Sequence, residues 1–268
     1  MQAHQTIYTP PKAWVNKLSR NAFLISEYFP MCGRYTYLGN PKVVTTPLDM
    51  VSRCSKPRYN IAPGQNAVVV RKMGSQDPVM EELRWGLVPS WARRPVTEHA
   101  TINARSETVA LKPSFRDSFR RRRCLVLADS YFEWQTIDRH KVPWRIMMKD
   151  ERAFALAGLW DKWFKGDGEV LETFTILTTE ANDLTEKLHP RMPVILPMHC
   201  WKCWLNPDLQ DPSGLQSLLR PFAQTGMRTY PVSTHVNSVA NDTERCIQPA
   251  QTPPCQGEFC FPGDKTSL

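Results

Sequence analysis

The sequence has no long apolar segment, few glycines and no dense cluster of cysteines. No stretch among its 268 residues approaches about eighteen consecutive apolar residues, the length that a membrane-spanning helix needs, so we expect a soluble protein with no membrane partner. Twelve glycines against 23 prolines exclude a glycine-rich linker, and 41% hydrophobic residues exclude a chain that is disordered throughout. The eight cysteines are spread from Cys32 to Cys260, which favours a reducing compartment over a disulfide framework.

Acidic residues are also in short supply. The chain has 34 lysines and arginines against 26 aspartates and glutamates, a formal net charge of +8. A positive excess of this kind favours association with polyanions such as nucleic acid, although it locates no site.

The chain divides by composition into three parts. Residues 1–30 lack the charged start and apolar core of a secretory signal, and we interpret them as a disordered extension or the product of an incorrectly assigned start codon rather than an organelle presequence. Residues 31–249 are expected to form one domain. Residues 250–268, rich in proline and glycine, are expected to be a disordered tail.

Short β-rich runs recur through the domain, whereas helical periodicity is rare. Apolar spacing of i, i+3 and i+7 predicts helices near 180–188 and 213–223. The fold class is therefore α+β, a strand-dominated mixed sheet with packed helices. The expected strands are 67–71, 124–128, 144–148, 154–160, 173–178, 194–196 and 229–233.

The segment from Met31 to Tyr35 contains the first candidate reactive group. As an interior segment it is an ordinary entry to a strand, because most cysteines are small buried hydrophobic residues. If the chain began at Met31 and this methionine were removed, Cys32 would carry a free α-amine beside its thiol. Such an aminothiol captures aldehydes, because the amine forms an imine and the thiolate then closes a five-membered thiazolidine ring.

Three further segments combine polar groups with strand or helix ends. Asn103 and Arg105 lie two apart on an extended stretch and so point to the same side, unless they form a solvated strand end. Glu133 lies between aromatic residues, where burial would raise its pKa and suit it to acid–base work; a structural glutamate is the alternative. His189, near Arg191, follows the first expected helix, whose dipole would favour the imidazolium; a helix cap is the alternative.

Two aromatic or basic segments and a pair of cysteines complete the candidates. The aromatic turn Trp85–Trp91 and the basic run Arg116–Arg123 could stack on bases and contact phosphates. Cys200 and Cys203 have the spacing of zinc ligands, but no second pair with matching context follows, so we expect neither a metal nor another cofactor. On a tryptophan-rich helix these two cysteines would face the core.

Six motifs occur together in the order and spacing of one protein family. From about residue 31 to 249 the chain resembles the SRAP family, the SOS response-associated peptidases. The resemblance implies a single SRAP-type domain with an open, barrel-like mixed or antiparallel sheet. The motifs that carry it are Met31–Tyr35, Tyr59–Gly64, Trp85–Trp91, Ile102–Thr108, Phe132–Trp134 and His189–Pro193.

The resemblance also implies a DNA repair function in the response to DNA damage. A member of this family would sense abasic sites in single-stranded DNA, including junctions with double-stranded DNA, and form a covalent thiazolidine crosslink through Cys32 that protects the lesion. Asn103 would position the sugar or the N-terminal group, Glu133 would move a proton between the amine and the ring oxygen, and His189 would assist ring opening and crosslink reversal.

The resemblance further assigns the contacts with DNA. The residues implied are Arg34, Arg105 and Arg191 on flanking phosphates, and Trp85 against a neighbouring base. The protein would act as a monomer, in the nucleus of a eukaryotic host or otherwise in the cytoplasm or nucleoid.

Thirty residues ahead of Met31 depart from the family pattern, because a cysteine within a peptide bond has no free amine. The favoured account is a wrong start codon; the others are internal initiation followed by methionine removal, and autoproteolysis before Cys32. Two alternative functions remain open. One is a thiol autopeptidase in which Cys32 attacks an amide with the help of Glu133 and His189, and the other is a non-covalent reader of modified DNA bases.

Overall fold

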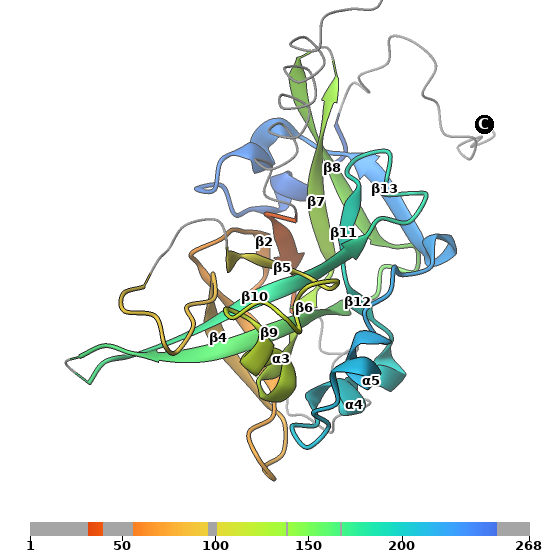
Figure 1. The fold of residues 1–268 in the computed structure, drawn as a ribbon. Helices are drawn as coiled ribbons and strands as arrows, with labels where there is room; N and C mark the ends of the chain where they lie inside the picture. The colour runs from red at the N-terminus through yellow and green to blue at the C-terminus, as the bar shows by residue number, and fades with distance from the viewer. Residues whose placement is uncertain (1–31, 40–55, 96–100, 138, 167, 251–268) are drawn as a thin grey trace, which may run out of the picture. The chain divides into compact units, whose positions relative to one another are not determined.

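The protein folds around a closed ring of five strands (Figure 1). The ring follows the order β10–β4–β3–β6–β9, and β9 then pairs with β10. All neighbours are antiparallel except β4 and β10, which run parallel. The strands are β3 (Asn66–Arg71), β4 (Val79–Trp85), β6 (Arg123–Ala128), β9 (Phe154–Phe164) and β10 (Val170–Glu180). The computed structural model describes residues 32–39, 56–95, 101–137, 139–166 and 168–250.

Side-chain size controls how the ring closes. Every residue of β6 is buried, as its continuous apolar run predicts for a strand covered on both faces. Gly158 of β9 lies where the wall is tightest: a Cβ atom there would lie 2.7 Å from Cys124 Sγ and 2.8 Å from Val126 Cγ2. Because real Cβ contacts are not that short, any larger residue would push β9 away from β6.

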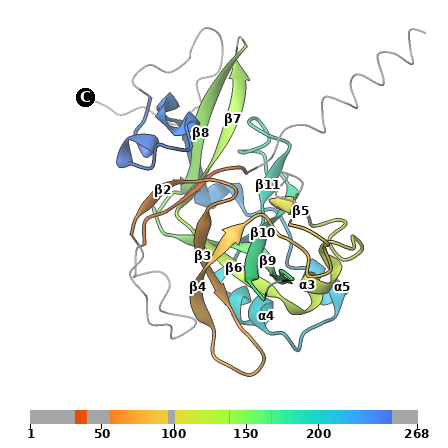
Figure 2. The same cartoon turned by 90° about the vertical axis from the view of Figure 1, so that its left-hand side faces the viewer.

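A second sheet of five antiparallel strands adjoins the ring. Its order is β13–β8–β7–β1–β2, and Asp129 is the single residue between β6 of the ring and β7 of this sheet. The long β7–β8 hairpin projects from the body of the domain (Figure 2). The strands are β1 (Tyr35–Tyr37), β2 (Arg58–Ile61), β7 (Ser130–Ile137), β8 (His140–Met148) and β13 (Met227–Pro231).

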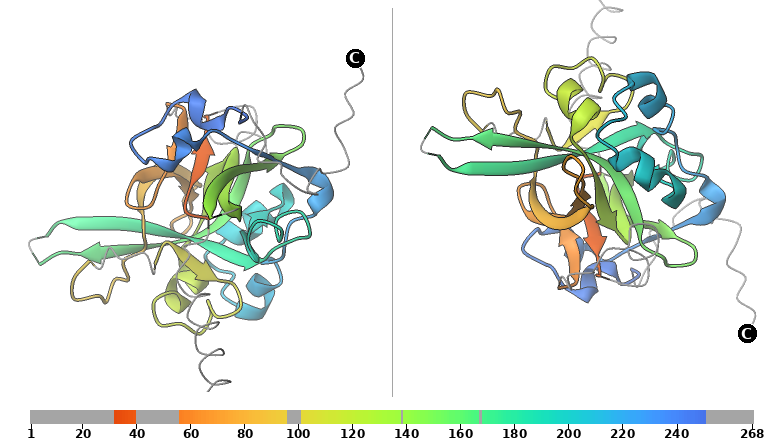
Figure 3. Two further views of the ribbon diagram at one scale, coloured as in Figure 1. Left: turned by 90° about the horizontal axis from the view of Figure 1, so that it is seen from above. Right: turned by 90° about the horizontal axis from the view of Figure 1, so that it is seen from below.

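Short elements complete the domain. Figure 3 shows α3, α4 and α5 on one side of the ring, where Phe119 of α3 and Trp204 of α4 pack with ring centroids 6.2 Å apart. None of the helices in these residues is long and apolar enough to cross a membrane. The remaining strands are β5 (Asn103–Arg105), β11 (Arg191–Pro193) and β12 (Ile195–Leu196). The helices are α3 (Arg116–Arg121), α4 (Trp201–Leu205), α5 (Pro212–Gln216), and the 3-10 turns η2 (Met198–Cys200), η3 (Gln224–Gly226), η4 (Thr234–Asn237) and η5 (Glu244–Ile247).

The strand-dominated mixed architecture expected from the sequence is confirmed, and each expected strand falls wholly or mainly within an observed one. The barrel is closed where we expected it to be open. The helix expected near 213–223 is short and ends at Gln216.

The helix expected near 180–188 is wrong, because two successive turns occupy this segment. The Asn182 carbonyl accepts from the amides of Thr185 and Glu186, and the Asn182 side chain also accepts from Thr185 N at 3.0 Å. This side-chain contact is the one that an N-cap residue makes at the start of a helix, so Asn182 begins the turns instead of opposing them. Pro190 then prevents a helix from continuing.

Arg123 is a buried cation at the junction of the helices and the ring. Its guanidinium donates to five backbone carbonyls at or just beyond the ends of α3 and α4, and it lies over the ring of Trp204. Those carbonyls are at the negative ends of the helix dipoles. Burial nevertheless lowers the pKa of Arg123 to about 10. The acceptors are the carbonyls of Phe119, Arg120, Trp204, Asn206 and Leu209.

We predict that Arg123→Met lowers the free energy of unfolding by on the order of 3 kcal/mol, because it leaves several buried carbonyls without a donor. The matched control is the exposed neighbour Arg121, where Arg121→Met should change stability by no more than about 0.5 kcal/mol. Urea denaturation of the two variants measures both values. Equal stability of the two variants would show that the buried guanidinium does not fasten the helices.

Candidate functional site

Cys32 lies beside Glu133 of β7. The backbone nitrogen of Cys32 donates to Glu133 Oε1 at 2.8 Å, and both residues are buried. The register of β1 and β7 sets this contact: Tyr35 pairs with Tyr131, so the chain that precedes Tyr35 runs past Glu133. Cys32 has a φ of +41°, a left-handed conformation that non-glycine residues adopt at a free-energy cost.

Burial controls the protonation of this pair. It raises the pKa of the Glu133 carboxyl to about 8, although the hydrogen bond from Cys32 N opposes the shift. The pKa of the Cys32 thiol is also raised, first by burial and then by the Glu133 charge. The expected burial and raised pKa of Glu133 are therefore found. A carboxyl group that titrates near neutral pH can both accept and deliver a proton.

Two tyrosines that sequence reasoning missed flank the pair. Tyr35 and Tyr131 are fully buried cross-strand partners, and the pKa of each hydroxyl is raised by burial and by the nearby Cys32. Tyr131 shares a face of β7 with Glu133, two residues away. The Tyr35 hydroxyl is buried and has no hydrogen-bond partner among the described residues. The sequence signal for Tyr131 is its spacing of two residues from Glu133, which puts both side chains on one face of a strand.

His189 is held in one tautomer. The amide of Arg191 donates to His189 Nδ1 at 3.1 Å, so the neutral ring carries its proton on Nε2. Burial lowers the pKa of His189, contrary to our expectation of an imidazolium favoured by a helix dipole, because no helix precedes it. Gln135 Nε2 donates to the Lys187 carbonyl at 3.3 Å, which places the preceding turn against β7.

The expected DNA-contacting residues near β10 differ in their availability. Asn103 and Arg105 lie on β5, which pairs with β10 as far as Thr178, and the side chain of Arg105 is exposed. Arg191 instead forms a bidentate ion pair with Glu107, with both N–O distances 2.9 Å, and donates to the Thr178 carbonyl at 2.7 Å. Arg105 is therefore open to a phosphate, whereas Arg191 already has a carboxylate partner.

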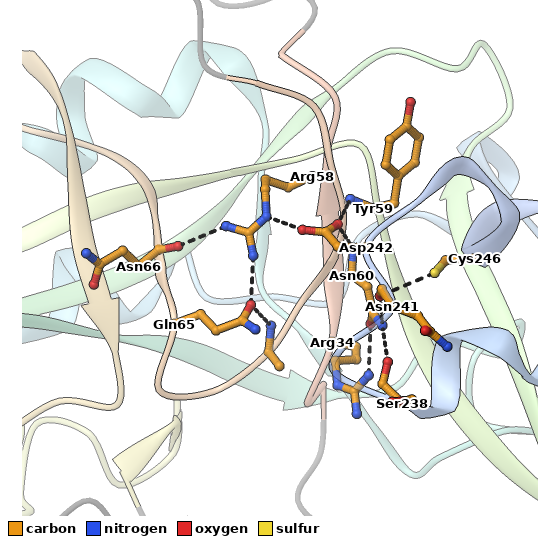
Figure 4. A network of polar contacts seen from close by, with 11 residues as sticks. Arg34, Arg58, Tyr59, Asn60, Gln65, Asn66, Ser238, Asn241, Asp242 and Cys246 are labelled. Carbon is orange, nitrogen blue, oxygen red and sulfur yellow. Dashed lines mark hydrogen bonds and ion pairs between the residues drawn. The ribbon is translucent and has the colours of Figure 1, made fainter.

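Arg34, for which a phosphate contact is expected, makes internal contacts in this structure, and its contact with DNA stays a prediction. Its guanidinium donates to Asn60 Oδ1 and to the Val236 carbonyl, both at 2.8 Å. Asn60 in turn donates to the carbonyls of Val236, Ser238 and Asn241, as Figure 4 shows in part. Arg34 and Asn60 thus fasten residues 236–241 to the part of the domain that contains β1 and β2.

Trp85 is also a correction, because it belongs to the core rather than to a base-binding wall. It is 1% exposed, its Nε1 donates to the Ile102 carbonyl at 2.9 Å, and its ring stacks on Phe174. The exposed aromatic residue of the same motif is Trp91, at 61%. It borders a cavity of about 320 Å³, lined by Leu87, Pro89, Trp91, Ala92, Arg93, Arg94, Thr101 and Ser114.

The remaining candidates are divided by burial. Within the basic run, Arg122 pairs with Asp161 and Arg123 is buried, so these two are not free for phosphate. Cys203 is exposed and Cys200 is half-buried, so the expectation that both face the core is wrong. In the part of the chain that the structure describes, no group of three His, Cys, Asp or Glu side chains is placed to hold a metal ion.

Comparison with known proteins identifies relatives along most of the chain. The abasic site processing protein YoqW of Bacillus subtilis is 41% identical over 223 residues, which cover 81% of this chain and 99% of YoqW. The abasic site processing protein HMCES of Gallus gallus is 34% identical over 228 residues, covering 73% of this chain and 67% of HMCES.

Two solved structures are similar to this chain in fold and in sequence. A protein from Bacteroides thetaiotaomicron has a TM-score of 0.64 at 32% identity and covers 71% of this chain and 84% of its own. A protein from Bordetella bronchiseptica has a TM-score of 0.66 at 25% identity, and the match covers 75% of this chain and 100% of that protein. The family model described as SOS response associated peptidase (SRAP) matches residues 31–239, and the chain therefore belongs to the SRAP family.

Proposed function

We propose that this protein processes abasic sites in single-stranded DNA by forming a covalent crosslink through Cys32. The observation that carries the proposal is the 2.8 Å contact between Cys32 N and Glu133 Oε1, which places a titratable carboxyl group on the nitrogen that would react. The names of the relatives, abasic site processing proteins, support the same substrate.

The reaction requires that Cys32 become the first residue. Its nitrogen is then an α-amine, which attacks the C1′ aldehyde of the open abasic sugar to give a carbinolamine. Glu133 takes a proton from this nitrogen and delivers one to the departing hydroxyl, so that water leaves and an imine forms. As the Cys32 sulfur adds to the imine carbon, Glu133 takes the thiol proton and delivers it to the nitrogen, which closes a thiazolidine with the net loss of one water.

The other expected residues support this chemistry from β5 and the turn before β11. Neutral His189, with its proton on Nε2, can donate to the sugar ring oxygen as the ring opens, and can take that proton back as the ring closes in reversal. Asn103 would orient the sugar. These two assignments rest on the family resemblance, together with the placement of both residues along β10.

Exposed basic and aromatic side chains would bind the flanking strand. Trp91 offers a face for base stacking, and Arg93, Arg94 and Arg105 offer charge to phosphates. The partner is abasic single-stranded DNA, including its junctions with double-stranded DNA, bound by a monomer. We place this activity where the DNA is, in the nucleus of a eukaryotic cell or in the cytoplasm or nucleoid otherwise.

A second candidate activity, autoproteolysis before Cys32, is favoured by the conformation of Cys32. Its left-handed φ strains the backbone beside the bond that must break, and Glu133 can protonate the nitrogen that would leave. This reaction would produce the free amine that crosslinking needs. The two activities would then be consecutive steps at one site.

Intact mass spectrometry tests the crosslink directly. Protein translated from Met31 and trimmed so that it begins at Cys32, incubated with a single-stranded oligonucleotide that bears one abasic site, should give an adduct whose mass is the sum of the trimmed protein and the oligonucleotide less one water. Cys32→Ala should give none, whereas the exposed control Cys203→Ala should react as the wild type does. No adduct from protein whose N-terminal Cys32 is confirmed in the same spectrum would refute crosslinking.

The full-length chain tests autoproteolysis in the same assay. We expect adduct only from molecules that have lost residues 1–31, and Glu133→Gln should slow that loss. Full-length protein that persists with Met1 in place, under conditions in which the shorter chain reacts, would contradict self-cleavage while leaving crosslinking intact.

Glu133→Gln should reduce the rate of adduct formation by about 10²–10⁴-fold at saturating DNA, because an amide cannot carry the proton. Single-turnover kinetics with protein that begins at Cys32 gives this rate. A variant that reacts within a few fold of the wild type would remove Glu133 from the proton transfer.

The stability of the same variant provides the control. Because burial raises the Glu133 pKa to about 8, the folded state binds a proton that the unfolded state releases above about 4.3. The contribution of Glu133 to wild-type stability should therefore be greatest below about pH 4.3 and should fall as the pH rises to about 8. Glu133→Gln should lack that slope, so a slow variant that is at least as stable excludes a folding defect.

A further inference from the structure

The loop that carries Trp91 is fixed to the β9–β10 hairpin at alternate residues. Residues 87–92 contain no helix or strand, so only specific contacts can hold the Trp91 ring in one place. Three hydrogen bonds do so, and they join Val88 N to Thr173 Oγ1 at 2.8 Å, Ser90 N to Asp161 Oδ2 at 3.0 Å, and Trp163 Nε1 to the Ala92 carbonyl at 2.7 Å.

The three anchoring side chains share one face of the hairpin. Asp161 and Trp163 are two residues apart on β9, and Thr173 of β10 is the direct cross-strand partner of Asp161. Because side chains alternate along a strand, all three project to the same side. The loop lies along this face, and Trp91, between two anchored residues, is left 61% exposed.

Of the three anchoring side chains, Asp161 is the one with a negative charge, which would repel DNA. Its side chain is 5% exposed and pairs with Arg122, Nε to Oδ1, at 3.1 Å. Arg122 follows α3, so a single carboxylate joins the helix, the hairpin and the loop. A buried carboxylate costs free energy unless it is paired and hydrogen-bonded, as Asp161 is with Arg122 and Ser90 N.

We propose that Asp161 is a positioning residue that acts through Trp91, holding the indole ring ready to stack on a base next to the lesion. This inference rests on the proposed function, because it assigns the means by which the same site binds the flanking strand. Loss of the Ser90 anchor lets the loop move, so the ring must be ordered when DNA binds and affinity falls.

Equilibrium binding by the full-length protein tests the proposal. The probe is a labelled single-stranded oligonucleotide with a tetrahydrofuran residue, an abasic analogue that has no aldehyde and so cannot crosslink. Trp91→Ala should raise Kd about tenfold, and Asp161→Ala should raise it several fold. The Trp91→Ala/Asp161→Ala double variant should bind no more weakly than Trp91→Ala alone, because Asp161 has no effect once the ring is gone.

Three further variants guard against misfolding and charge effects. Trp163→Phe removes one anchor without changing charge, and it should show the same lack of additivity with Trp91→Ala. Asp161→Asn keeps an acceptor for Ser90 N and should bind more tightly than Asp161→Ala. Asp150→Asn makes the same charge change at an exposed carboxylate and should leave Kd within about twofold of the wild-type value.

A measurement without DNA separates this inference from the proposed function. Hydrogen exchange at the Ser90 amide should be faster in Asp161→Ala than in the wild type. Losses that multiply in the double variant, or an unchanged Kd in Asp161→Ala, would overturn the positioning role. A wild type that binds the analogue but forms no adduct with a true abasic site would instead refute crosslinking and leave the role of Asp161 standing.

Discussion

The antiparallel pairing of β1 with β7 is the constraint on which the site depends. Tyr35 pairs with Tyr131 and Thr36 with Ser130, and the hydroxyls of Thr36 and Ser130 are 2.7 Å apart in a buried contact. A shift of one residue would turn Glu133 to the opposite face of the sheet, away from Cys32. Because β7 continues β6 after a single residue, the closed ring fixes the position of the same strand. The contact between Cys32 and Glu133 is thus determined by the core.

The charges of this basic chain have two different uses. Several arginines bind internal carbonyls or carboxylates. Arg34 donates to the Val236 carbonyl, Arg123 donates to carbonyls at the helix ends, and Arg191 pairs with the Glu107 carboxylate. Others, such as Arg93 and Arg105, remain exposed at the surface, and Arg93 lines the same cavity as exposed Trp91. Net charge alone does not separate these groups. The structure therefore shows which of the basic side chains are exposed and so could contact a polyanion such as DNA.

The sequence predicts the strands and the reactive residues better than it predicts contacts. The run 124–128 is recognisable as a strand because five apolar residues are too few for a buried helix, and aromatic neighbours correctly indicate a buried Glu133. The segment 180–188 fails because β10 runs to Glu180 and Pro190 stops the turns that begin at Asn182, so no helix has room to form, and apolar spacing does not record these limits. Trp85 and Trp91 are equivalent in a sequence motif, and only tertiary packing shows that the first is core and the second exposed. The expectations for residues 1–30 and the tail beyond residue 250 lie outside the described residues.

The central claim is that the Cys32 nitrogen and sulfur share one carbon of the DNA. An adduct made with ¹³C at C1′ of the abasic sugar and ¹⁵N in Cys32 allows NMR to identify the atoms bonded to that carbon. The account predicts a direct coupling of C1′ to the Cys32 nitrogen and a correlation through sulfur to the Cys32 β-protons. A C1′ bonded to the nitrogen of another residue, or to no protein nitrogen, would contradict it.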